Sequence, residues 1–197
     1  MVRCIKILQA LFLVFFSFAA IAQEKIEGVS PCVDSIINTL QTNTAYQPVK
    51  TKITGKKAIL KSDKAQDTFK QEKVLSWIDK VEKDSINAYA LNNAEYTCYV
   101  LSSSVKQATG LAINFTSWLI IIPNSNLVFE FESLSQNPKL IYFDQETSKL
   151  NFVRFTYGEH FFCKRDWDNV DFKMELNEID NGELKLVSSK NSWCSEY

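Results

Sequence analysis

The sequence contains a single histidine, His160, and this scarcity restricts the chemistry that the chain can perform. A zinc site usually combines histidine and cysteine ligands, and no C-x-x-C pair is present to supply them. Only five glycines occur, all isolated, so no glycine-rich loop can cradle a phosphate. The G-x-S-x-G motif of serine hydrolases is also missing. We therefore expect a protein that is not an enzyme and that binds neither a metal nor a cofactor.

Long apolar runs are scarce as well, and the longest lies at the N-terminus. Residues 7–20 are almost entirely apolar, Arg3 and Lys6 precede them, and the small-x-small sequence AIA follows before Gln23. This is the order of parts in a cleaved signal peptide. The run is shorter than the roughly 20 residues that a spanning helix needs. We expect residues 1–22 to be a signal peptide of the bacterial type and the mature chain to be secreted or periplasmic, without a membrane span.

Positive charge is not in excess. Removing the signal takes away two of the 22 basic residues and none of the 23 acidic ones, which leaves a net charge of −3 and argues against nucleic-acid binding. The exception is the stretch 49–64, which holds six lysines against one acid, Asp63. It is either a docking patch for an acidic partner or, as we favour, a solvated edge hairpin that turns at Gly55.

Cysteines are few, but their number is informative. Cys4 leaves with the signal, and an even number in an exported chain predicts two disulfides. We expect Cys163–Cys194, closed by a C-terminal tail that turns back over the last hairpin. We expect Cys32–Cys98 to pin the first helix to the sheet. Four buried free thiols are the alternative.

The periodicity predicts an α+β fold that is mostly β. Apolar residues at helical spacing follow Pro31, and Thr68-x-x-Gln71 has the form of a capping box, so we expect an N-terminal helical segment over 30–87. From Tyr96 onward the apolar residues alternate with period two. The expected strands are 96–102, 111–122, 127–132, 140–143, 150–157, 159–164, 170–176 and 183–187. Short loops favour one antiparallel meander of about eight strands, a bent sheet or barrel-like, within a single domain over 23–197.

Two local signals refine this topology. The apolar parity switches between Phe152 and Val153, which predicts a β-bulge. Asn181-Gly182 is the strongest hairpin signal in the chain, because both central positions of a tight turn favour positive φ.

Residues 157–170, YGEHFFCKRDWDNV, gather the histidine with a cysteine and several charges. This could be a catalytic or metal-binding cluster, or a hairpin whose polar residues face water. On a strand over 159–164, His160 and Cys163 point to opposite faces, so the cluster separates. The acids from Asp166 onward do not follow the spacing of a calcium loop. We favour the hairpin and assign no catalytic or metal-binding residue here.

Aromatic residues are abundant between residues 127 and 172, and several fall on both faces of one strand. Either helices and loops cover the second face, or the aromatics form a binding surface or line a ligand-filled interior. The candidate aromatic binding surface consists of Tyr142, Phe143, Phe155, Tyr157 and Trp167.

These features favour an exported, non-enzymatic binding protein that recognises another macromolecule, with a protein as its partner, as an inhibitor or immunity-type protein does. The alternative is a carrier of a small apolar ligand in a lipocalin-like β-barrel, although the G-x-W signature of lipocalins is missing. A hydrolase of unrecognised type comes third. A closed internal cavity would favour the carrier, and a filled core would favour the binding protein.

Export makes the first testable prediction. The exported form of the protein should begin at or near Gln23, because cleavage follows the small-x-small sequence. N-terminal sequencing of protein from the periplasm or medium checks this. Soluble protein that retains Met1 would contradict both the localisation and the oxidising environment on which the disulfides depend.

Overall fold

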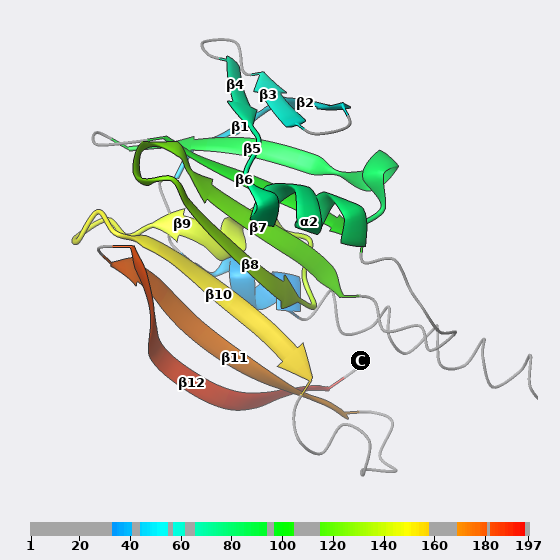
Figure 1. Ribbon diagram of the computed structural model, residues 1–197. Helices are drawn as coiled ribbons and strands as arrows, with labels where there is room; N and C mark the ends of the chain where they lie inside the picture. The colour runs from blue at the N-terminus through cyan, green and yellow to red at the C-terminus, as the bar shows by residue number, and fades with distance from the viewer. Residues whose placement is uncertain are drawn as a thin grey trace, which may run out of the picture.

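The computed structural model describes residues 33–40, 44–54, 57–61, 66–93, 97–104, 115–157, 169–180 and 182–195 (Figure 1). Within these ranges, twelve strands form three antiparallel sheets, which confirms the predicted antiparallel, mostly β character. No helix in the described part of the chain is long and apolar enough to cross a membrane.

The first sheet has five strands in the order β1-β5-β6-β7-β8. Its strands are β1 (Tyr46–Pro48), β5 (Asn87–Asn92), β6 (Thr97–Ser104), β7 (Thr116–Ile122) and β8 (Leu127–Ser133). The second sheet has the order β12-β11-β10-β9. Its strands are β9 (Ile141–Phe143), β10 (Leu150–Tyr157), β11 (Asn169–Asp180) and β12 (Glu183–Ser195).

A smaller third sheet has the order β2-β3-β4. In the sequence, its three strands follow β1 and precede β5 of the first sheet. It comprises β2 (Lys50–Thr54), β3 (Lys57–Lys61) and β4 (Gln66–Phe69). The helical elements are a short helix over 33–38, α2 (Glu72–Lys80), η1 (Lys83–Ser85), η2 (Pro123–Ser125) and η3 (Pro138–Leu140).

The centre of the first sheet is buried on both faces. All seven residues of β7 are buried, and they alternate between two hydrophobic clusters. Trp118 and Ile120 belong to one cluster, whereas Leu119 and Ile121 belong to the other. A strand covered on both faces is typically an unbroken apolar run, as β7 is from Trp118 to Ile122, because each face packs against another layer of the protein.

One face of the first sheet is covered by α2 and the third sheet. From α2, Val74 and Trp77 are fully buried, and from β3, so is Leu60. The Trp77 Nε1–H donates to Ser117 Oγ on β7 at 2.8 Å, so the one polar atom of the indole is satisfied inside this cluster.

The second sheet and the helix over 33–38 cover the other face. Val33 and Ile37 from the helix are fully buried among the aromatics of β8, β10 and β11. The rings of Phe131 and Phe152 stack with centroids 4.2 Å apart. Ser135 Oγ donates to the Asp34 carboxylate, which fixes the helix to the loop after β8. The helix is therefore held by apolar packing and by one charge-assisted hydrogen bond.

The end of β8 also joins the two large sheets. Leu134 N–H donates to the Phe155 carbonyl at 3.0 Å, and Phe155 N–H donates to Ser133 Oγ at 3.1 Å. The chain thus makes two successive meanders that meet where β8 ends beside β10 (Figure 1). The single meander of about eight strands is therefore corrected to two meanders and a separate small sheet.

The expected N-terminal helical segment over 30–87 also needs correction. Only residues 33–38 and α2 are α-helical in the described part of it, and strands β1 to β4 occupy much of the rest. The expected capping box fails because Thr68 pairs with Ile59 in β4, and Gln71 makes no side-chain cap hydrogen bond. The lysine-rich hairpin is confirmed, with Thr54 opposite Lys57 on either side of its turn.

The predicted bulge at Phe152 and Val153 is wrong. The β10–β11 register is continuous from Leu150↔Ile179 to Tyr157↔Phe172. The alternation of apolar residues changes here because Phe152 and Val153 are both buried, at 2% and 3% exposure, although they point to opposite faces of the strand. The register shift lies instead between β11 and β12.

The predicted two-residue hairpin turn at Asn181-Gly182 is confirmed. Asp180 pairs with Glu183 on either side of it, and Gly182 has a φ of 85°, which L side chains rarely adopt. The strand expected over 159–164 lies outside the described residues. The expected meander placed this strand between β10 and β11, whereas β10 and β11 pair directly.

The packing predicts which aromatic residues hold the two large sheets together. Phe155→Ala should lower the free energy of unfolding by about 3–5 kcal/mol, since the fully buried ring leaves a cavity behind it. Leu186→Ala, at an exposed position, is the control and should change it by no more than about 0.5 kcal/mol. Equal effects of the two variants in denaturant titration would contradict the assignment of this core.

Candidate functional site

Strand β12 presents the largest exposed apolar side chains in the described part of the chain. Leu184, Leu186 and Val187 are 51%, 54% and 51% exposed. Residues 183–191 are exposed at every position, so neither face of this strand is covered. β12 also ends the sheet order and pairs only with β11 among the described strands. Over residues 183–191, both faces of β12 are therefore exposed, and no other described strand pairs with its outer edge.

The register shift shapes this strand. Leu176 pairs with Ser188 and Asn177 with Leu186, so Val187 is the extra residue of a bulge. A bulge re-aims side chains and increases the local twist. Lysines are typical of edges that resist indiscriminate pairing, and here Lys185 lies between Leu184 and Leu186 and Lys190 follows them. The edge is thus restricted by charge and by twist, yet it contains no proline to block pairing altogether.

A second feature is the outer face of the β2–β3 hairpin, which we call the lysine face (Lys50, Lys52, Lys57 and Lys61). All four side chains are exposed. The register places Lys50 opposite Lys61, and residues two apart on a strand share a face. The opposite face of the hairpin is apolar and packs into the core through Ala58 and Leu60.

The third sheet is fixed to the large sheet by a polar contact as well. The Tyr99 hydroxyl on β6 donates to the Asp67 carboxylate on β4. Burial, and then this hydrogen bond to an anionic acceptor, raise the pKa of Tyr99 above its ordinary value. The lysine face is therefore carried by a sheet with both apolar and polar anchors.

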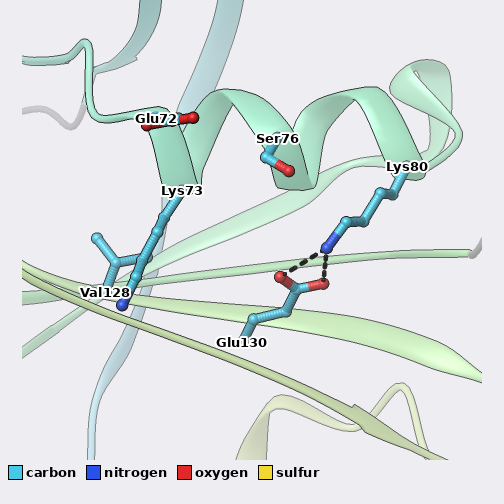
Figure 2. Close-up of a pocket in the computed structure, with 6 residues that line it drawn as sticks. All are labelled: Glu72, Lys73, Ser76, Lys80, Val128 and Glu130. Atoms are coloured by element: carbon cyan, nitrogen blue, oxygen red, sulfur yellow. Dashed lines mark hydrogen bonds and ion pairs between the residues drawn. The ribbon is translucent and has the colours of Figure 1, made fainter.

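A third feature is a groove of about 360 Å³ between α2 and β8 (Figure 2). It is lined by Glu72, Lys73, Ser76, Lys80, Val128 and Glu130. Lys80 Nζ lies 3.0 and 3.1 Å from the two Glu130 carboxylate oxygens, and Figure 2 shows this pair across one end of the groove. Because charged groups line it and already pair with each other, the groove suits a small apolar ligand poorly.

The candidate aromatic binding surface is only partly at the surface. Phe143 and Phe155 are buried in the core at 8% and 0% exposure, so their assignment to a binding surface is wrong. The reason is that Phe143 on β9 and Phe155 on β10 both belong to the hydrophobic cluster of the core. Tyr142 and Tyr157 pack half-buried against the core, and burial raises the pKa of both phenols. Trp167 lies outside the described residues.

The cysteines do not form the expected pattern where the structure describes them. Cys98 is a free thiol, fully buried in the core, so the Cys32–Cys98 disulfide is not supported. The tail does not turn back as expected, because β12 runs on to place Cys194 opposite Val170. Cys32, Cys163 and the side chain of Cys194 lie outside the described residues, as does His160.

No group of three or more histidine, cysteine, aspartate or glutamate side chains that could hold a metal ion occurs within the ranges that the structure describes. Comparison of the chain with family models, curated proteins and solved structures found no match.

The last strand is longer than the predicted 183–187, because β12 continues to Ser195. A signal was present, since no glycine or proline occurs between residues 188 and 195 to end the strand. The lysine face can also be recognised in the sequence from the spacing of its residues. Lys50 and Lys52 alternate with period two, as do Lys57 and Lys61 around Ile59.

The environment of Cys98 makes a prediction about its reactivity. Burial raises the pKa of this thiol, and the thiolate is the reactive form, so native protein should not be alkylated at Cys98 at pH 8. Unfolding in guanidinium without reductant should make it fully alkylatable, which mass spectrometry of its peptide measures. Protection of Cys98 that only a reductant removes would contradict the free thiol and restore the predicted disulfide.

Proposed function

We propose that this chain is an exported, non-enzymatic binding protein that recognises another protein by adding an extended segment of that partner to the open edge of β12. In this mode of binding, main-chain hydrogen bonds supply affinity and alternate side chains supply specificity. The observation that carries the proposal is the exposure of Leu184, Leu186 and Val187 on a strand whose outer edge pairs with no other described strand. Natural proteins usually shorten or cover such an edge, since it invites aggregation.

The charges of β12 indicate what the partner segment should contain. Residues directly opposite each other in an antiparallel pair share a face, and opposite charges stabilise such pairs. The segment should therefore carry an acidic residue facing Lys185 or Lys190 and apolar residues facing Leu184 and Leu186. An apolar segment without the acid would leave the lysines unpaired beside it, which limits promiscuous binding.

The packed interior supports this proposal over a carrier of a small apolar ligand. The space between the two large sheets is filled by aromatic rings and by the helix over 33–38. Trp118, Phe152, Phe155 and Phe172 are each at most 2% exposed there. A carrier needs an interior cavity lined by such residues, and here the residues fill the interior themselves.

The experiment is capture of the partner with matched variants of one exposed residue. The mature chain is immobilised and exposed to its own periplasmic extract or medium, and the retained protein is identified by mass spectrometry and purified. The dissociation constant of the complex between the chain and this partner should rise at least tenfold for Leu186→Lys, because a charge at the edge opposes strand addition. Leu186→Val keeps an apolar β-forming side chain and should bind within about threefold of the wild type, less than 1 kcal/mol.

Both variants should unfold within about 0.5 kcal/mol of the wild type, since position 186 is exposed. A partner that binds the wild type and Leu186→Lys equally well would place recognition elsewhere on the molecule. Failure to retain any protein, together with tight binding of a fatty acid or similar ligand in native mass spectrometry, would favour the carrier instead.

A further inference from the structure

The lysine face is the strongest charged surface in the described part of the chain that the proposed function does not use. Its four ammonium groups form a two-dimensional array on one side of two paired strands. Residues two apart on a strand are separated by roughly 6.6 Å, and directly opposite residues by roughly 5 Å. Lys50 and Lys52 on one strand thus lie beside Lys57 and Lys61 on the next.

These lysines differ from several others in having no described acidic neighbour. Lys80 pairs with Glu130, Lys83 with Asp79, Lys149 with Glu178 and Asp180, and Lys173 with Glu175. No ion pair within the described residues involves the lysine face. The chain as a whole has a net charge of −1, so the lysine face is a local positive patch on a slightly negative protein.

The arrangement also works against the stability of the hairpin. Like charges directly opposite each other in an antiparallel pair destabilise it, and Lys50 faces Lys61. Lysines do protect sheet edges, but that role does not require them to face one another. A bound array of negative charges would remove the repulsion, so the pattern is consistent with a surface that is meant to be covered.

We propose that the lysine face docks the protein on the surface of an anionic lipid bilayer. A plane of phosphate groups can meet all four ammonium groups at once, because they project from one face of a sheet. An acidic peptide would follow one row and meet only two of them. Ile59 lies half-buried at the centre of the face, and the lysine stems around it can lie along apolar surface while their charges reach phosphates.

The choice of lysine over arginine favours a surface over a defined pocket. Arginine recognises a single phosphate or carboxylate through a forked pair of hydrogen bonds, whereas lysine acts as a point charge. Clusters of such charges bind anionic membranes through the summed field, and the attraction falls off within a Debye length. The third sheet and β12 lie at opposite ends of the molecule in Figure 1, so docking would leave β12 free.

Co-sedimentation with vesicles tests this inference. The mature chain should sediment with vesicles of phosphatidylcholine mixed with phosphatidylglycerol, and not with phosphatidylcholine alone. Binding should be lost as the salt rises from about 0.1 M toward about 1 M, because the Debye length shrinks from about 10 to about 3 Å. Lys50→Glu/Lys61→Glu should lower the partition coefficient at least tenfold.

The control is Lys83→Glu/Lys139→Glu, which makes the same change in net charge at exposed positions outside the lysine face. It should retain most of the binding. If the first pair of substitutions lowers the melting temperature, Lys52→Gln/Lys57→Gln replaces it, since it removes charge without adding like-charge contacts.

Three results would overturn the inference: no binding to the anionic vesicles at low salt, equal binding to vesicles of phosphatidylcholine alone, or equal losses in the test and control variants. Binding of poly-glutamate without any binding to vesicles would assign the lysine face to an acidic protein instead. Capture of the protein partner through β12 is measured separately, so failure of one proposal leaves the other testable.

Discussion

The structure depends on the burial of the first sheet on both of its faces. β7 has no exposed residue, and on β6 Cys98 and Val100 face one cluster while Tyr99 and Leu101 face the other. A single antiparallel sheet covered on one side cannot satisfy such strands. The chain therefore supplies two covers: α2 with the third sheet on one face, and the second sheet with the helix over 33–38 on the other. The remaining elements are positioned by this requirement.

The surfaces proposed for recognition lie where the covering layers end. β12 is the outermost strand of one cover, and the lysine face is the outer side of the other. Both lie on or beside strands that are anchored by fully buried residues, Phe172 on β11 and Leu60 on β3. A binding surface on a strand that is fixed by its neighbour loses little conformational entropy when a partner arrives. The stable core and the open edges thus have complementary roles.

The sequence predicted those features that depend on local chemistry. The Asn181-Gly182 turn and the lysine-rich hairpin are predicted from residues close together in the chain. Prediction from the sequence failed where contacts with residues distant in the chain determine the secondary structure. Thr68 follows β3 into a strand although it resembles a helix cap, and Val153 faces a second layer that no local pattern reveals. β12 was cut short because serine and asparagine are weak β formers, whereas its pairing with β11 extends it to Ser195.

Two features are central: the first sheet is covered on both faces, and the outer edge of β12, in the second sheet, is open among the described strands. Hydrogen exchange tests both most directly. Amides of β6 and β7 should exchange only through global unfolding, because both faces and both edges of these strands are covered. In the peptide spanning 183–192, the amides that point away from β11 should exchange orders of magnitude faster. The account predicts this contrast in the isolated mature chain by mass spectrometry. A peptide 183–192 as fully protected as β7 would contradict it, because the edge of β12 would then already be occupied.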